Sequence, residues 1–172
     1  MRPDHTLGYW MIRAAHSFGT AFVGVLQAHC TERGKPYMIT PPQWGTLAWL
    51  DEYNGLPIGT LAQYLGIEAS VTTGIVKRLE QNGLVERVHD REDRRIVKVY
   101  LTAEGQDLVR SLDSVITTFN ERPFQGFSHE ERQTFLEQLH RILINLSDDA
   151  DEHASLFNSF RHQLNEQGGW DM

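Results

Sequence analysis

Cysteine, long apolar stretches and net positive charge are all scarce in this sequence. Its 172 residues include one cysteine, Cys30, which excludes an intrachain disulfide and a metal site built from several cysteines of one chain. No apolar run approaches the roughly 20 residues that a membrane span needs. The first ten residues, MRPDHTLGYW, lack the basic and then apolar order of a signal peptide. We therefore expect a cytoplasmic protein with no membrane partner.

Short motifs of common enzyme classes are also missing. The chain contains no glycine-rich phosphate loop, no nucleophile elbow and no pair of histidines around a glutamate. Its composition, 40% hydrophobic and 23% charged residues, is that of an ordinary globular protein. These features predict a binding protein that is not an enzyme and needs no cofactor.

Metal and thiol chemistry have little support in the sequence. The eight histidines are scattered, and no two stand at the helical spacing of a bidentate metal clamp. His16 and His29 share one predicted helix but lie several turns apart. Cys30 has no basic neighbour before Arg33, although a reactive thiolate usually has one nearby. No metal site is predicted, and a redox- or metal-responsive protein remains an alternative.

The formal net charge of −7 argues against a protein that coats nucleic acid non-specifically, because that mode of binding needs broad positive charge. Positive charge is nevertheless concentrated in one place. Within nine positions the chain carries four arginines, Arg87, Arg91, Arg94 and Arg95. An acidic protein with one basic segment can still bind nucleic acid through that segment.

Hydrophobic periodicity predicts a mostly helical chain. Apolar residues at helical spacing run from Thr6 to Cys30 and end at the glycine and proline of residues 32–36. Thr40, followed by two prolines, predicts the cap of a short helix. Two further helices follow, residues 58–66 and 68–83, and each closes on a glycine.

Strands and more helices are predicted after residue 83. Residues 84–89 and 96–101 read as two strands around a loop, residues 90–95. Residues 102–120 and 128–146 have helical periodicity, and a last helix is predicted after Asp148. A helix, a tight turn, a second helix and a two-stranded ribbon with a basic tip are typical of a winged helix-turn-helix. The second helix of this motif enters the major groove of DNA.

The helix of residues 70–82 has the side chains that such a role needs. We expect Val71, Ile75 and Leu79 to form its buried stripe, so that five polar residues point away from the core: Ser70, Thr72, Thr73, Lys77 and Arg78. Short hydroxyls and cations suit base edges and phosphates. A polar face that only contacts water is the alternative, but the absence of carboxylates before Glu80 favours DNA.

Residues 61–105, LAQYLGIEASVTTGIVKRLEQNGLVERVHDREDRRIVKVYLTAEG, resemble the DNA-binding core of MarR-type transcriptional regulators. The segments that carry the resemblance occur in the family's order: GLVER at 83–87, DRR at 93–95 and LTAEG at 101–105. The resemblance implies a sequence-specific, DNA-binding transcriptional regulator. Repression is the family's commoner mode of action, and we expect it here.

The resemblance also implies roles for single residues. Ser70, Thr72 and Thr73 match positions that contact the major groove, and Lys77 and Arg78 match contacts to base edges or phosphates. Thr73 stands where many relatives carry an arginine.

For the loop between the two strands, the wing, the resemblance implies an arginine that enters the minor groove, and either Arg94 or Arg95 matches it. Asp93 matches an acid that braces the wing by pairing with an arginine. We favour Arg95 for the brace and Arg94 for the groove. Arg91 replaces a proline found in many relatives and adds a cation for a phosphate contact.

The fold class expected from these features is mostly α, a winged helix-turn-helix DNA-binding domain with a helical dimerisation domain formed by the N- and C-terminal helices. Residues 1–36 form the N-terminal dimerisation helix, residues 37–105 the DNA-binding domain and residues 106–172 the C-terminal dimerisation helices. A homodimer presents two recognition helices, so it should bind a near-palindromic double-stranded operator. A winged-helix module that binds only proteins is the alternative, although it has no need of the wing arginines.

A small-molecule effector is implied by the same resemblance. In such regulators, small and often phenolic anions bind between the dimer body and the DNA-reading heads. The candidate contacts here are six residues of the first two predicted helices, in which an arginine near aromatic rings could hold a carboxylate: Trp10, Met11, Arg13, His16, Trp44 and Trp49. The expected ligand is an aromatic acid or its thioester. Core packing of the tryptophans is the alternative.

Overall fold

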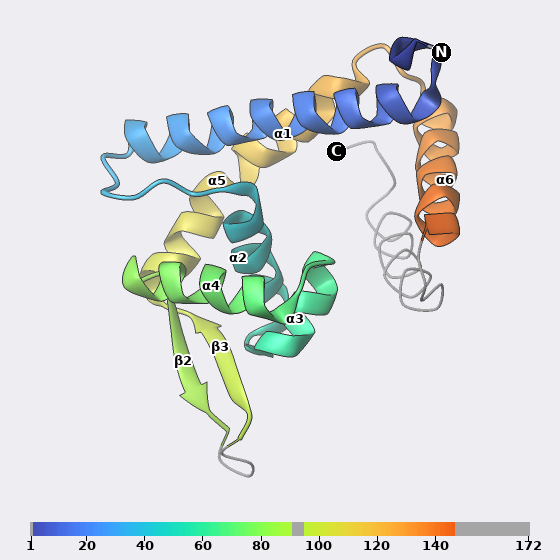
Figure 1. Cartoon of the computed structure of the whole chain (residues 1–172). Coiled ribbons are helices and arrows are strands. Elements are labelled where there is room, and N and C mark those ends of the chain that lie inside the picture. Colours follow the sequence, from blue (N-terminus) through green and yellow to red (C-terminus); the bar gives the residue numbers. More distant parts are fainter. Residues whose placement is uncertain (1, 91–94, 147–172) are drawn as a thin grey trace. The chain divides into compact units, whose positions relative to one another are not determined.

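The structure, a computed structural model, describes residues 2–90 and 95–146. The chain divides into two compact units, Met1–Phe119 and Asn120–Met172. Figure 1 shows that helices dominate the first unit and that one short ribbon of strands projects from it. The expected mostly helical, winged helix-turn-helix fold is confirmed. The predicted helix beyond Asp148 lies outside the described residues.

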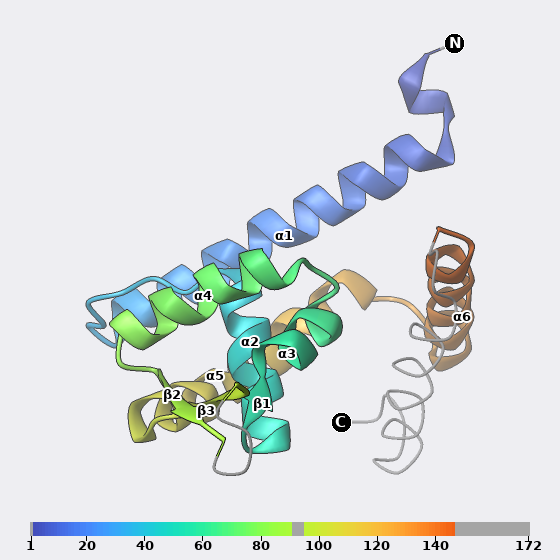
Figure 2. The same cartoon turned by 60° about the horizontal axis from the view of Figure 1, so that its bottom comes forward.

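The first long helix, α1 (Leu7–Glu32), follows a short 3₁₀ turn, η1 (Pro3–His5). Its amino terminus is capped by the Thr6 side chain, whose oxygen accepts a hydrogen bond from the Tyr9 backbone N–H at 3.3 Å. The carboxyl half of α1 contributes Leu26 and Cys30 to the core, whereas its amino half extends beyond the next three helices of the same unit (Figures 1 and 2).

The helix α5 (Ala103–Glu121) packs against α1. The Phe119 ring stacks on Phe22 of α1, with ring centroids 5.0 Å apart. The Ser111 hydroxyl donates to the Leu108 carbonyl oxygen at 2.8 Å and lies within hydrogen-bond distance of His29 Nε2, also at 2.8 Å. These contacts join α1 to α5 through one aromatic pair and one partly buried polar pair.

The helix-turn-helix consists of α3 (Ile58–Leu65) and α4 (Ala69–Gln81), preceded by α2 (Pro41–Tyr53). Thr40 begins α2 as predicted, and the Gln43 side-chain oxygen accepts from its backbone N–H at 2.9 Å. Gly66 ends α3 with φ 63°, and Gly83 follows α4 with φ 72°. Both angles lie in the left-handed region that favours glycine, so the glycine stops seen in the sequence are confirmed.

The sheet has three strands in the order β1 (Leu56–Pro57), β3 (Val97–Leu101) and β2 (Val85–His89), all antiparallel. The pair β2 and β3 agrees with the predicted wing strands to within one residue. The two-residue strand β1 was not predicted, because so short a segment has no alternation and pairs with a strand some 40 positions later, Leu56 opposite Val99. Gly55, with φ 103°, precedes it, and a Cβ there would collide with the Tyr100 ring.

The segment LTAEG joins the wing to α5. The Thr102 hydroxyl donates to the Gly83 carbonyl oxygen at 2.6 Å, and its oxygen accepts from the Gly105 N–H at 3.1 Å. Gly105 lies so close to the Leu84 carbonyl that a Cβ would overlap its oxygen. The motif therefore docks the start of α5 on the end of the reading helix, α4.

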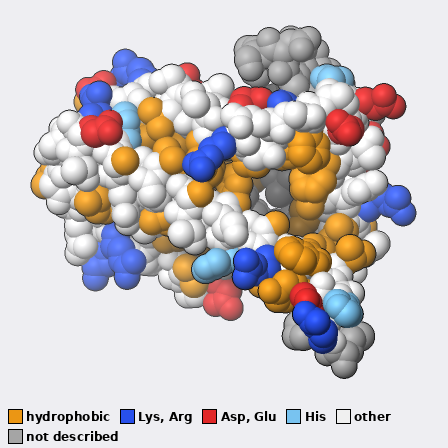
Figure 3. Space-filling model, turned by 90° about the horizontal axis from the view of Figure 1, so that it is seen from above, with side chains coloured by type: hydrophobic (Ala, Val, Ile, Leu, Met, Phe, Trp, Pro, Cys, Tyr) orange, Lys and Arg blue, Asp and Glu red, His pale blue; other side chains and the backbone are white. Residues whose placement is uncertain are grey.

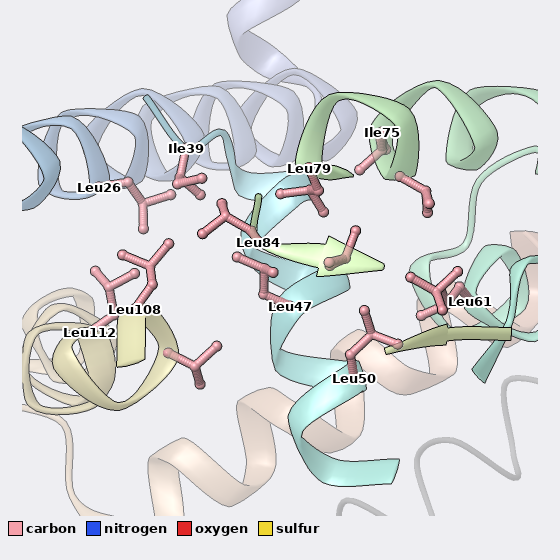
Figure 4. Close-up of a cluster of buried hydrophobic side chains, with 14 of the residues drawn as sticks. Leu26, Ile39, Leu47, Leu50, Leu61, Ile75, Leu79, Leu84, Leu108 and Leu112 are labelled. Atoms are coloured by element: carbon pink, nitrogen blue, oxygen red, sulfur yellow. The ribbon is translucent and has the colours of Figure 1, made fainter. Parts of the chain in front are cut away.

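Fully buried leucines and other apolar side chains from α1 to α5 and from the three strands form one core. Figure 4 shows them converging from α1, α2, α3, α4 and α5, with Leu84 at the centre of the group. This core holds α4 in a defined rotation about its own axis, and that rotation decides which of its side chains reach solvent.

The second unit contains the short 3₁₀ helix η2 (Arg122–Phe124), followed by the helix α6 (His129–Leu146). None of the helices described is long and apolar enough to cross a membrane.

Candidate nucleic-acid interface

The buried face of α4 differs from the predicted one. Its buried residues are Thr72, Ile75, Val76 and Leu79, whereas Val71 is 52% exposed. The prediction that Val71 is buried and that Thr72 points outward is therefore wrong. The predicted and the observed sets of buried residues both have helical spacing, and packing against the core favours the set in which Val76 is buried.

Thr72 can be buried because its hydroxyl finds a partner within the helix. Its Oγ1 donates to the backbone carbonyl oxygen of Glu68 at 3.2 Å, a bond that many buried helical threonines make. The side chain is fully buried, so in this structure its hydroxyl does not face solvent. This burial disfavours the predicted DNA contact of Thr72, which stays a prediction.

The other predicted α4 contacts are exposed. Ser70, Thr73, Lys77 and Arg78 lie on the solvent side of the helix. Ser70 Oγ donates to the Glu68 carboxylate at 3.1 Å, and Thr73 Oγ1 donates to the Ala69 carbonyl oxygen at 2.8 Å. Each hydroxyl oxygen can still accept a hydrogen bond, for example from the exocyclic amine of a base.

The carboxylate at the end of α4 is paired with the wing. Arg87 of β2 donates to both carboxylate oxygens of Glu80, from Nε at 3.1 Å and from Nη2 at 2.5 Å. Hydrogen bonding from this guanidinium lowers the pKa of Glu80, and the same bond raises the pKa of Arg87. The pair fixes the strand to the helix and offsets the negative charge of Glu80, the acidic residue of α4.

An ion pair that the sequence analysis missed braces the base of the wing. The Lys98 ammonium of β3 lies 2.8 Å from the Asp90 carboxylate, and the Asp90 N–H donates to the Ile96 carbonyl oxygen at 2.9 Å. Asp90 and Lys98 are eight positions apart, and only the hairpin register, which places Val88 opposite Lys98, brings them together. The alternation Ile96, Lys98, Tyr100 was the one available signal.

Most of the wing tip lies outside the described residues. This is true of Arg91, of Arg94 and of Asp93, the predicted brace. Arg95 is described and is exposed in the turn two residues before β3 begins. The assignments of the groove and brace arginines therefore stay predictions.

Within one chain the predicted effector residues form separate groups. Trp10, Met11, Arg13 and His16 are exposed on the amino half of α1, and the Trp10 indole N–H donates to the Asp4 carbonyl oxygen at 2.9 Å. At about 1.5 Å per residue, Arg13 lies roughly 20 Å along the helix from the buried Leu26.

The two α2 tryptophans are placed elsewhere. Trp44 packs, partly buried, against the core. Trp49 stacks on Tyr64 with ring centroids 4.6 Å apart, and Tyr53 completes a cluster of three rings. Both views show α2 below the carboxyl half of α1 (Figures 1 and 2), away from the amino half that carries Arg13.

Cys30 and the described histidines bear on the redox and metal alternatives. Cys30 is fully buried, and this burial raises the pKa of its thiol, which disfavours the thiolate that oxidants attack. Across the described parts of the chain, no three His, Cys, Asp or Glu side chains gather as a metal site would require.

The helix pair α3 and α4, the paired ribbon and the basic outer face of α4 define a winged-helix DNA-binding protein. The MarR family model matches residues 39–97. The uncharacterised HTH-type transcriptional regulator YsmB of Bacillus subtilis is 35% identical over 106 residues, which are 62% of this chain and 73% of YsmB. The chain belongs to the MarR family, so it is a DNA-binding transcriptional regulator and not an enzyme.

Two solved structures of transcriptional regulators have a fold similar to that of this chain. A MarR-family transcriptional regulator from Silicibacter pomeroyi matches with a TM-score of 0.64 at 29% identity, over 86% of this chain and 94% of that one. The PcaV transcriptional regulator from Streptomyces coelicolor, in complex with its natural ligand, matches with a TM-score of 0.72 at 22% identity, over 83% and 94% of the two chains.

Proposed function

We propose that this regulator binds a near-palindromic operator as a homodimer, represses transcription there and is released by a small aromatic or anionic effector. The observation that carries the proposal is the division of α4 into two faces. One face is locked in the core, and the other presents Ser70, Thr73, Lys77 and Arg78 to solvent. In this arrangement the hydroxyls reach base edges and the cations reach phosphates.

The dimer is inferred from apolar side chains that one chain leaves exposed. On α1, Leu7 is 85%, Ile12 74% and Trp10 57% exposed. Figure 3, which looks down on α1, shows hydrophobic side chains at the surface of this face. Because monomers rarely expose many large apolar side chains in one region, we propose that residues 1–36 and 106–172 form the dimer body. Two-fold symmetry then sets the half-sites roughly 10 base pairs apart, centre to centre.

The test of the dimer is its mass in solution. Sedimentation at micromolar concentration should give a dimer for the wild type and a larger monomer fraction for Ile12→Asp. Asp51→Asn, a change of charge at an exposed position of α2 outside the proposed dimer body, is the control. A wild-type chain that sediments as a monomer would rule out the homodimer.

DNA contacts by α4 are tested through salt dependence. Replacing Lys77 and Arg78 by alanine should weaken operator binding and reduce the salt slope by about 0.9 for each phosphate that the variant no longer neutralises. Arg141→Ala, an exposed arginine of α6, should leave both unchanged. Unaltered affinity and slope in the α4 variant would contradict the assignment.

The wing contacts of Arg91, Arg94 and Arg95 need a separate variant. Replacing Arg94 and Arg95 together by alanine should lower the affinity for DNA upstream of the regulator's own gene. It should also flatten the salt dependence. If affinity and slope stay the same, the wing does not contact the operator.

The effector site would need two chains. The α1 group of Trp10, Met11, Arg13 and His16 lies apart from Trp44 and Trp49 in one chain, so a pocket that uses both groups would form between subunits. The PcaV transcriptional regulator has a similar fold and was solved in complex with its natural ligand, which supports the proposal that a small molecule binds this regulator as well.

A thermal-shift screen of aromatic acids and their thioesters tests the site. A binding acid should raise the melting temperature of the wild type and release operator DNA. Arg13→Ala should lose the response to the carboxylate, whereas Arg33→Ala should keep it. An equal response in both variants would remove Arg13 from the site.

A further inference from the structure

Val71 stands out on the reading helix because it is apolar and exposed. Every other large hydrophobic side chain of α4 is buried: Ile75, Val76 and Leu79. Valine is also a weaker helix former than alanine, and at 52% exposure it adds little to the core. Within the fold, then, this side chain has no evident stabilising role.

The neighbours of Val71 allow close approach of a ligand to the helix. Ser70 is small, and a Cβ built on Gly74, one turn after Val71, would meet nothing within 4 Å. Side chains at i and i+3 are neighbours on a helix surface, so the valine methyl groups lie beside an open stretch of backbone. The first two turns of α4 therefore offer a shallow surface with one apolar contact.

Two positively charged side chains lie further along the helix, beyond this apolar surface. Lys77 and Arg78 are exposed six and seven positions after Val71, roughly 10 Å along the axis. Cations placed there can hold phosphates at the groove edge while the start of the helix faces the bases. Among base edges in the major groove, the C5-methyl group of thymine is the apolar feature.

We propose that Val71 contacts the C5-methyl group of one thymine in each operator half-site and is a specificity-determining residue. The inference rests on the proposed insertion of α4 into the major groove. It assigns to Val71 a direct part in sequence discrimination between thymine and cytosine, because cytosine has no such methyl group.

Deoxyuridine scanning tests this contact atom by atom, since deoxyuridine differs from thymidine only in lacking that methyl group. An operator is first selected from random duplexes with the full chain. Each thymine pair related by the two-fold axis is then replaced by deoxyuridine, and the affinity is measured. At one position the wild type should bind about fourfold more weakly per half-site, the value expected for one buried methyl group.

The variant Val71→Ala should bind the unmodified operator more weakly and should be indifferent to deoxyuridine at that same position. Alanine favours the helix, so the thermal unfolding midpoint should not fall. Val88→Ala on β2, at 44% exposure, is the matched control. Whatever its affinity, it should keep the wild-type profile of deoxyuridine sensitivity.

The outcomes separate this inference from the proposed function. If the wild type selects an operator but no deoxyuridine position weakens it, or if Val71→Ala keeps every sensitivity, the thymine contact is wrong and operator binding stands. If the full chain selects no sequence at all, the proposed function fails and the inference fails with it.

Discussion

Arg87 holds both carboxylate oxygens of Glu80, so one ion pair ties the end of the reading helix to the first strand of the wing. The two residues are seven positions apart and flank the turn at Gly83. The angle between helix and ribbon decides whether both can reach the same stretch of DNA. This pair is one of the interactions that set that angle.

The stabilising effect of the pair should depend on pH. The pKa of Glu80 is lowered in the folded chain by the hydrogen bond from Arg87. Its contribution is therefore present above the ordinary glutamate pKa of about 4.3 and is lost as the pH falls through the lower folded-state pKa. Urea unfolding at about pH 7 and about pH 3 should show a larger Glu80→Gln difference at the higher pH. Asp107→Asn, which breaks the exposed pair with Arg110, should change the free energy of unfolding less. An equal change in the two variants would argue against a specific stabilising effect of the Glu80–Arg87 pair.

Gly105→Ala should destabilise the DNA-binding domain. A Cβ at residue 105 would overlap the Leu84 carbonyl oxygen, and that backbone atom cannot rotate away. We expect a decrease of about 1–3 kcal/mol in the free energy of unfolding, the usual cost of overpacking. Gly24→Ala, with open space around its Cβ, should instead add up to about 1 kcal/mol through helix propensity. Chemical denaturation of the two variants measures both, and a decrease of the same size in each would refute the clash.

Thr72→Val should leave the operator preference unchanged. Thr72 is fully buried and its hydroxyl is satisfied by the Glu68 carbonyl oxygen, so removing the hydroxyl should alter the free energy of unfolding by no more than about 1.5 kcal/mol. Ser70→Ala, which removes an exposed hydroxyl from the same helix, should change the preference. Selection from random duplexes with each variant compares them. A new preference for Thr72→Val would mean that α4 turns on binding DNA.

Gly74→Ala should stabilise the fold but weaken operator binding. Nothing within 4 Å opposes a Cβ at this position, so alanine should raise the free energy of unfolding by about 1 kcal/mol. If α4 lies deep in the major groove, the same methyl group should weaken operator binding. Thermal melting and a binding titration of one protein sample give both quantities. Stabilisation with undiminished affinity would show that the groove does not approach Gly74.

Local signals in the sequence predicted most of the helices and their ends. Thr6 and Thr40 at the helix starts, and Gly66 and Gly83 after the helix ends, act through bonds and backbone angles confined to a few neighbouring residues. Such features depend little on the rest of the chain. The strand pair of the wing was predictable for a similar reason, because hairpin partners are close in sequence.

Long-range pairing was not predictable. The strand β1 exists because Leu56 reaches Val99, and the brace of Asp90 with Lys98 exists because the hairpin adopts one register. In neither pair does the sequence around one residue indicate which other residue it will contact. From the sequence, the wing brace was predicted at Asp93, which lies outside the described residues.

The winged-helix order, the family and the basic, hydroxyl-rich character of the reading helix can all be read from the order of the amino acids. The rotation of that helix cannot, because it depends on packing against distant segments. Periodicity allows either Val71 or Thr72 to face inward, and the packing of Val76 and Leu79 against a shared core selects Thr72. Thr72 accepts burial because Glu68 satisfies its hydroxyl, and Val71 is thereby left on the surface that faces DNA in the proposed complex.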